Sequence, residues 1–317
     1  MSPSSSSPWL SGQTAVASGL DEEDRRAPSQ GLLLLGDNFY ETGLEAEELV
    51  GRVRGNLVAP YCRFVELRGP RSAEVSGGCE PGRRALPAAI YAVLGNHDLE
   101  APESRELQVR EVPRFVSNWK MPEPPAAALE IAEGVSLILF DSTSLRESGD
   151  PGPLRAALAA SRGPWRILAG HHPVGTSRDH GFKKASGVGD YGALVEAAIR
   201  DAGVPVQLML AGHEHNLQLL RRPEHGPRLV AVSGGGSSPG RVKSKSAGRM
   251  FSYEGLGFAR VDLITGDGRE RLMVTFFAAP RWRSLLGAAP ELLARWSVTV
   301  DGDLLAEPLS VRTVESS

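Results

Sequence analysis

The chain has 317 residues, of which 41% are hydrophobic and 23% are charged, an ordinary composition for a globular protein. This composition excludes a wholly disordered chain. The formal net charge of −3 gives no global attraction to nucleic acid or to an anionic membrane. No apolar run approaches the roughly 18 residues that a membrane-spanning helix needs, so we expect neither a nucleic-acid nor a membrane partner.

Residues 1–30 are polar and rich in turn formers, and we expect an irregular N-terminal segment apart from a short helix around Gln13 to Ala17. Met1 to Leu10 lacks the basic and apolar regions of a signal peptide. As the sequence stands we expect a cytoplasmic location. A secreted location would follow if a further N-terminal segment precedes these residues.

Short apolar runs that stop at Gly or Asp recur along the chain and predict buried strands. These runs cover residues 31–35, 88–94, 135–140, 165–169 and 206–211. Helix-like segments between them cover residues 44–54, 153–161 and 191–201. Residues 61–86 form a long Gly/Pro/Arg-rich loop. Cys62 and Cys79 both lie in this loop, and two cysteines are too few to decide between a disulfide and two unrelated thiols.

Later apolar runs follow one another more closely and predict an antiparallel or mixed second sheet. They cover residues 228–232, 257–263 and 272–277. Asp301-Gly302, between two β-prone segments, predicts a hairpin within a C-terminal extension over residues 280–317. Since no linker divides the chain, we expect one domain over residues 1–317.

Histidines gather where predicted strands end. Five of the seven follow a predicted strand within four residues, and Asp37, Asn38 and Tyr40 follow the first strand in the same way. Four segments therefore begin with Gly at a strand end: Gly36-Asp37-Asn38-Phe39-Tyr40, Gly95-Asn96-His97-Asp98, Gly170-His171-His172-Pro173 and Gly212-His213-Glu214-His215. In α/β sheets, ligands bind beyond the carboxyl ends of the strands.

Asp, Asn, Tyr and several His together suit metals such as zinc, iron or manganese. In His213-x-His215 the two imidazoles would point to the same side and could serve two adjacent metals, with Asp37 bridging them. Two such metals form a standard arrangement for phosphoryl transfer. The alternative is that each segment is an ordinary turn, since Gly, Asn and Asp are turn formers. Four such turns, all rich in ligand residues, make that alternative a poor explanation.

The order GDNFY, GNHD, GHHP, GHEH resembles the calcineurin-like metallophosphoesterases, and Tyr at the fifth position is similar to the purple acid phosphatase branch. The match runs from about residue 31 to 263. The resemblance implies an α/β fold of two packed mixed β-sheets flanked by helices, a four-layer sandwich.

The resemblance also implies roles for single residues. Asp37 would bridge both metals. Tyr40 and His215 would bind the first metal, normally iron, and Asn96, His171 and His213 would bind the second, which is zinc, manganese or iron. His97 and His180 would lie outside the ligand shell as catalytic residues, and with Asn96 they would bind the substrate phosphate. His172 would lie behind the ligands.

The sequence departs from the family in one respect. The family begins with a strand that ends in Asp-x-His or Asp-x-Gly, and that Asp is a ligand of the first metal. Residues 1–20 contain no Asp, Glu or His, so this first strand is missing from the sequence. Either the given sequence starts downstream of it or this form lacks the ligand. We therefore expect the first metal site to be weak or empty.

We expect hydrolysis of phosphate esters, with phosphomonoesters preferred, by a metal-bound hydroxide at a dinuclear site. The partner would be a phosphorylated small molecule or protein, and the loops do not reveal which one. The alternative is a degenerate member that binds a phosphorylated ligand without efficient turnover. The missing Asp favours this alternative.

Overall fold

The computed structural model describes residues 11–306 apart from 82–83, 85, 177–189, 223–225, 243–245, 247 and 267. The helices are α1 Gly12–Arg26, α2 Leu49–Arg52, α3 Ser72–Val75, α4 Ser104–Glu106, α5 Val112–Phe115, α6 Ser142–Ser148, α7 Gly152–Ala160, α8 Tyr191–Ala202 and α9 Arg281–Leu285, with π-helical stretches at Val53–Val58 and Leu107–Glu111 and a 3₁₀ turn at His97–Leu99. The strands are β1 Gly31–Leu34, β2 Ala89–Ala92, β3 Trp119–Lys120, β4 Ala126–Ala132, β5 Val135–Phe140, β6 Trp165–Ala169, β7 Leu208–Ala211, β8 Leu217–Arg221, β9 Leu229–Ser233, β10 Arg249–Tyr253, β11 Gly257–Ile264, β12 Arg271–Ala278, β13 Glu291–Thr299 and β14 Leu304–Ala306.

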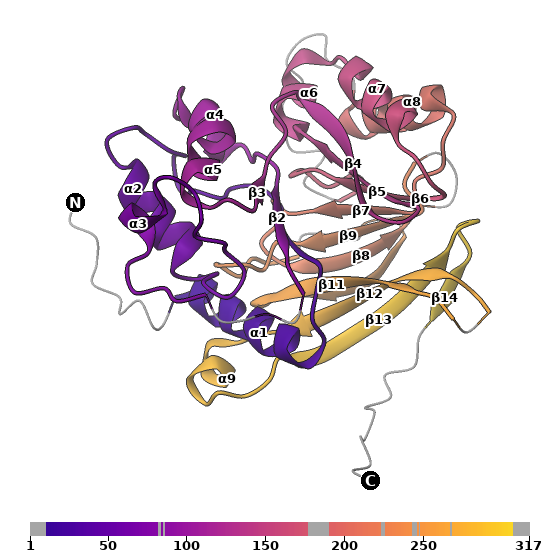
Figure 1. Ribbon diagram of the computed structural model, residues 1–317. Coiled ribbons are helices and arrows are strands. Elements are labelled where there is room, and N and C mark those ends of the chain that lie inside the picture. The colour runs from indigo at the N-terminus through magenta and orange to yellow at the C-terminus, as the bar shows by residue number, and fades with distance from the viewer. Residues whose placement is uncertain are drawn as a thin grey trace.

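A seven-stranded mixed sheet, in the order β10-β8-β9-β7-β6-β5-β4, forms the centre of the molecule (Figure 1). Its inner strands, β5 to β9, are buried on both faces, whereas the edge strands β4 and β10 are half-buried. Alternate residues of the inner strands belong to different cores. Ile138 and Leu168 face helices α7 and α8, whereas Leu137 and Ile167 face the four-stranded sheet β11-β12-β13-β14. This explains why β5 and β6 are continuous apolar runs in the sequence.

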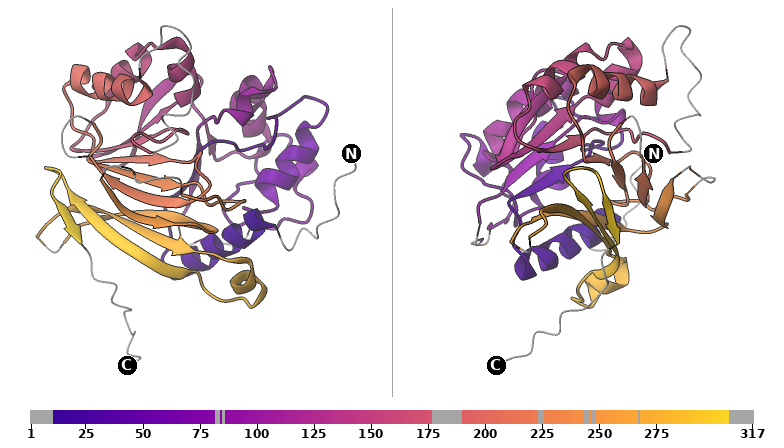
Figure 2. Two further views of the ribbon diagram at one scale, coloured as in Figure 1. Left: turned by 180° about the vertical axis from the view of Figure 1, so that it is seen from behind. Right: turned by 90° about the vertical axis from the view of Figure 1, so that its right-hand side faces the viewer.

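Helix α1 covers the outer side of the four-stranded sheet, so helices and sheets form four layers (Figure 2). This confirms the prediction of packed sheets flanked by helices, with one difference. The layer below the central sheet is divided, because β1, β2 and β3 form a separate three-stranded parallel sheet. Helices α2 to α5 pack against that smaller sheet around Phe39, Val53 and Phe115.

Helix α1 corrects the expectation of an irregular N-terminal segment, since it continues well past Ala17 to Arg26. Its second half is charged and has no apolar stripe that would reveal it. It is stabilised instead by ion pairs, such as Arg25 to Asp21 at 2.8 Å. The buried Asp24 carboxylate also accepts hydrogen bonds from Arg63 and Arg84, which lie in the loop over residues 61–86, at 2.9 and 2.7 Å.

The later strands also differ from the prediction in their partners. Strand β9 was expected in the second sheet but pairs in parallel with β7 in the central sheet. The hairpin at Asp301-Gly302 is confirmed, since Val298 pairs with Leu304. Strand β13, within the predicted C-terminal extension, lies inside its sheet between β12 and β14, and its Ala294 and Val298 are buried in the core.

The segment predicted as a helix over residues 44–54 contains only α2 and the start of the π-helical stretch. In the long loop that follows, Cys62 and Cys79 form a disulfide, which decides a question that the sequence left open. Among the described residues, no helix combines the length and apolarity needed to cross a membrane.

We expect the double variant Cys62→Ser, Cys79→Ser to lose about 2–4 kcal/mol of unfolding free energy, because the bond constrains a loop of the unfolded chain. Urea unfolding with and without dithiothreitol measures this loss. Reductant should destabilise the wild type and leave the double variant unchanged. Two free thiols in the unfolded, unreduced protein would contradict the pairing.

Candidate functional site

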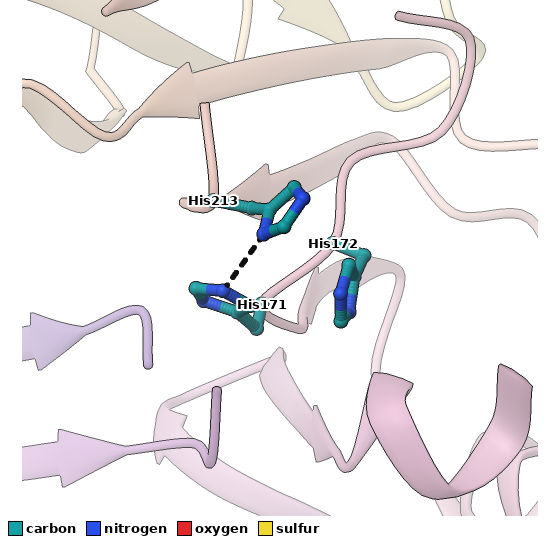
Figure 3. A group of neighbouring side chains, drawn as sticks. All are labelled: His171, His172 and His213. Atoms are coloured by element: carbon teal, nitrogen blue, oxygen red, sulfur yellow. Dashed lines mark hydrogen bonds between the residues drawn. The ribbon is translucent and has the colours of Figure 1, made fainter. Parts of the chain in front are cut away.

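The four Gly-led segments meet at the carboxyl ends of β1, β2, β6 and β7. Figure 3 shows His171 and His172, which follow β6, facing His213, which follows β7. Asp37 lies in the loop after β1, and Asn96 lies in the loop after β2. Because parallel strands end at a common edge, residues up to 136 positions apart in the sequence come into contact here.

Three ligand atoms form a nearly equilateral triangle. Asn96 Oδ1 lies 3.2 Å from His171 Nε2 and 3.2 Å from His213 Nδ1, and these two nitrogens lie 3.2 Å apart. Asp37 Oδ2 lies 3.4 Å from His171 Nε2. Ligand atoms about 2.0–2.1 Å from a tetrahedral zinc ion would be separated by about 3.3–3.4 Å. The triangle therefore has the size of a metal-binding site.

Backbone contacts orient His171 for this role. Its Nδ1–H donates to the carbonyl oxygen of Leu35 at 2.7 Å, since a carbonyl can only accept. In the neutral imidazole, Nε2 then carries the lone pair that faces Asn96 and His213. If both histidines are neutral, Asn96 Oδ1 and His171 Nε2 are acceptors, and only His213 Nδ1 could carry a proton. The three atoms therefore offer more acceptor lone pairs than protons. This donor set fits a borderline metal cation.

The Asp37 carboxylate is mostly buried beside these groups. Burial alone would raise its pKa, but the adjacent His171 imidazole and the backbone N–H of His97 lower the pKa below its ordinary value. That N–H donates to Asp37 Oδ1 at 3.1 Å. Asp37 is therefore held as an anion at the edge of the triangle, as a metal ligand must be.

Asp37 and His213 share an unusual backbone conformation. They are the non-glycine residues with left-handed φ in the described part of the chain, at 55° and 61°. Such conformations are disfavoured for residues with a side chain and gather at functional sites. No sequence pattern predicts this conformation at Asp37 and His213.

Asp98 is a further residue of the site, for which the sequence assigned no role. Its buried carboxyl group accepts hydrogen bonds from the backbone N–H groups of Gly95, Asn38 and Phe39, at 2.9, 3.1 and 3.0 Å. Burial raises its pKa even though these three donors oppose the shift. Asp98 thus joins the loop after β1 to the loop after β2 and so positions Asp37 beside Asn96.

His172 lies behind the triangle, as expected. Its Nδ1 lies 2.9 Å from Ser142 Oγ, and its backbone N–H donates to the same hydroxyl at 3.0 Å. Burial, together with neighbouring His171 and His213, keeps its pKa well below the ordinary value, so the ring stays neutral. Its ring nitrogens are near enough to the triangle to be possible ligands by distance alone, but the hydrogen bond to Ser142 gives the ring a positioning role.

The remaining predicted residues lie around Tyr40. The Tyr40 ring is partly exposed, with its centroid 4.4 Å from that of His97 and 6.3 Å from that of His215. The Tyr40 ring thus lies beside the rings of His97 and His215, which are the residue after Asn96 and the second residue after His213. His180, predicted as a catalytic residue, lies outside the described residues.

Comparisons with known proteins agree with this geometry. Residues 20–217, more than half of the chain, match the family model described as calcineurin-like phosphoesterase. The chain is 24% identical to human tartrate-resistant acid phosphatase type 5 over 233 residues, which is 65% of this chain and 61% of that protein. It is 27% identical to purple acid phosphatase 4 of Arabidopsis thaliana over 220 residues, 61% of this chain and 60% of that protein.

The chain therefore spans about three fifths of the length of these two relatives. Among solved structures, it is similar in fold to a purple acid phosphatase from yellow lupin, with a TM-score of 0.57 and 13% identity over 95% of this chain and 53% of the lupin chain. The resemblance of the motifs to the purple acid phosphatase branch is confirmed by these relatives.

We expect His213→Gly to reduce bound metal to near zero, because it removes one corner of the triangle while glycine tolerates the φ of 61°. His172→Asn is the matched control, since its amide can keep the contact with Ser142. Metal content measured by mass spectrometry on both variants tests the assignment. Undiminished stoichiometric metal in His213→Gly would refute it.

We expect Gly95→Ala to weaken metal binding by roughly 10–100-fold, the range for residues that orient ligands. A Cβ at Gly95 would overlap the Asp37 carboxylate. Gly51→Ala is the control, because a Cβ there meets no heavy atom within 4 Å. Titration calorimetry with zinc compares the two. Equal affinities would show that the close approach of Gly95 does not position Asp37.

Proposed function

The chain belongs to the calcineurin-like phosphoesterase family, and from that premise we propose that it hydrolyses phosphate esters, with monoesters preferred. The single observation that carries this proposal is the triangle of Asn96, His171 and His213 with Asp37 at its edge. The acid phosphatases among its relatives support the same reaction class.

We propose that Asp37, Asn96, His171 and His213 hold the second metal and that Asp37, Tyr40 and His215 hold the first. When bound, the metals would lower the pKa of water and neutralise the charge on phosphate oxygens. Iron at the first site, with zinc, manganese or iron at the second, follows the family pattern. The first set offers Asp37 as its one carboxylate, and this residue would be shared with the second metal, so we expect the first set to bind iron weakly.

We propose His97 as the group that protonates the leaving oxygen. Its Nδ1–H donates to the carbonyl of Glu41 at 2.8 Å and lies 2.9 Å from Glu100 Oε1. Nε2 is therefore the atom that would carry a transferable proton. The backbone N–H of His97 donates to Asp37, which keeps the ring beside the metal ligands. Asn96 and His97, with His180, would contact the phosphate.

The test is turnover of 4-nitrophenyl phosphate by the purified chain supplied with iron, zinc or manganese, with His213→Gly as the inactive control. We expect metal-dependent hydrolysis that the control lacks. Metal-replete protein with no turnover of any phosphate ester would sink the proposal.

We expect His97→Asn to keep its bound metal while turnover of phenyl phosphate falls roughly 10²–10⁴-fold, the usual loss for a general acid. The loss should be smaller for 4-nitrophenyl phosphate, whose leaving group needs little protonation. Loss of metal in parallel with activity would instead make His97 a ligand.

The second candidate is binding of a phosphorylated ligand without turnover. The composition of the first ligand set favours it, because Asp37 is its one carboxylate and would be shared with the second metal. Stoichiometric binding of orthophosphate by metal-replete protein, with no hydrolysis of aryl phosphates, would select this candidate.

We further propose that the chain works in an oxidising compartment rather than the cytoplasm expected from its sequence. The Cys62–Cys79 disulfide supports this, because such bonds persist mainly in oxidising environments. Alkylation of cell extracts before reduction, followed by mass spectrometry of both cysteines, would test it. Alkylated cysteines would favour the cytoplasm.

A further inference from the structure

His172 is the histidine of the group in Figure 3 that the proposed ligand sets leave out. One nitrogen atom of His172 lies within 4.8 Å of a nitrogen atom of His171 and of one of His213. The ring centroids of His172 and His213 are 4.4 Å apart. Ligand nitrogens of one tetrahedral zinc ion are about 3.3–3.4 Å apart, so a displacement of the His172 ring by about 1–2 Å would create a three-histidine site.

A hydrogen bond to Ser142 opposes this displacement. Ser142 comes two residues after β5, which runs parallel to β6, so Ser142 and His172 lie at the same edge of the central sheet. Asp141 accepts hydrogen bonds from the N–H groups of Thr143 and Ser144, at 3.0 and 2.9 Å, and thereby fixes the backbone around Ser142. The Ser142 hydroxyl lies 2.9 Å from His172 Nδ1 and accepts from the His172 backbone N–H at 3.0 Å.

The backbone of His172 is fixed on its other side as well. Its carbonyl oxygen accepts a hydrogen bond from the Tyr191 hydroxyl at 2.8 Å. Because the N–H and the C=O are both bonded, the ring can move only by rotation about its own side-chain bonds. Among the residues that the structure describes, Ser142 is the hydrogen-bond partner of this ring. Ser142 therefore sets the orientation of the His172 ring.

The proton in the contact between Ser142 and His172 can be assigned by counting. A serine hydroxyl has one proton to donate and two lone pairs that accept. Ser142 is fully buried, and within the described residues its hydroxyl proton has no acceptor except His172 Nδ1. If Nδ1 carried a proton, the buried hydroxyl proton would be left without an acceptor, which is unfavourable. The hydroxyl therefore donates to Nδ1.

This assignment makes both nitrogen atoms of His172 unavailable to a metal. Burial and the neighbouring His171, His213 and Arg146 disfavour a second proton on the ring, so the ring is neutral and carries its one proton on Nε2. The lone pair of Nδ1 accepts from Ser142, and Nε2 is protonated. A metal ligand needs a free lone pair, and neither nitrogen offers one.

We propose that Ser142 selects the metal at the second site by keeping His172 out of its ligand set, an inference that rests on the second metal site proposed above. With His172 excluded, that site offers two imidazoles, an amide oxygen and a carboxylate. Oxygen ligands suit manganese, whereas imidazole ligands suit nickel and copper. The Ser142 hydroxyl therefore weakens the binding of nickel and copper relative to that of manganese.

The first test locates the proton on His172 in the metal-free full chain. Long-range ¹H–¹⁵N correlation spectra of protein labelled with ¹⁵N-histidine report which ring nitrogen is protonated, and His172→Asn identifies the His172 signals by their loss. We expect a proton on Nε2 and none on Nδ1. A proton on Nδ1 would overturn the proposal. This measurement needs no Ser142 variant, so it decides the question even if Ser142→Ala fails to fold.

The second test compares the affinities for nickel and manganese. We expect Ser142→Ala to raise nickel affinity relative to manganese affinity by at least about tenfold, the lower end of the range for residues that orient ligands. Ser148→Ala is the matched control, because this exposed serine of the same helix bonds to the Ser144 carbonyl and should leave the ratio unchanged. Adding His172→Asn to Ser142→Ala should abolish the gain. An unchanged ratio in Ser142→Ala, or a gain that persists without His172, would contradict the role of Ser142.

Zinc added to the labelled protein distinguishes failure of this inference from failure of the proposed function. In the wild type, zinc should shift the signals of His171 Nε2 and His213 Nδ1 and leave the proton of His172 on Nε2. Zinc bound to a His172 nitrogen in the wild type would refute the role of Ser142 alone. No zinc response at His171 and His213 would refute the metal site itself. No arm of these tests measures hydrolysis.

Discussion

The buried carboxyl group of Asp98 is the contact on which the candidate site depends. It accepts hydrogen bonds from three backbone N–H groups that belong to two separate loops. Together with the hydrogen bond from the His97 N–H to Asp37, it anchors the loop after β1 to the loop after β2 and so holds Asp37 beside Asn96. The packing of buried Phe39 near Trp119 adds to the same anchor, with ring centroids 6.5 Å apart. Asp98 contributes no atom to the triangle, yet it sets the distances between the residues that form it.

The site concentrates features that are unfavourable elsewhere in a protein. Two residues with side chains adopt left-handed φ, two histidines and an amide oxygen point at one another, and a carboxylate lies mostly buried beside them. Each of these features has a cost in free energy when no cation is present. Their presence together at one strand edge is what a bound metal would offset.

The division of the inner layer into two sheets follows from the order of elements along the chain. The first described element is α1, which runs over the four-stranded sheet, and the chain then passes directly into β1 beside β2. Nothing in the described residues lies between β1 and β11, so the edges of two sheets border a single cavity that reaches the metal site.

The sequence by itself determined the strand ends and the residue types that gather there. Apolar runs such as Val135–Phe140 and Trp165–Ala169 coincide with β5 and β6, because burial on both faces leaves a signal in consecutive residues. Only the tertiary structure decided the second half of α1, the Cys62–Cys79 bond and the role of Asp98. These features depend on contacts between residues far apart in the chain, such as Asn38 and Asp98 at a separation of 60. A local sequence pattern cannot predict such contacts, because the residues next to each partner in the sequence do not depend on the contact.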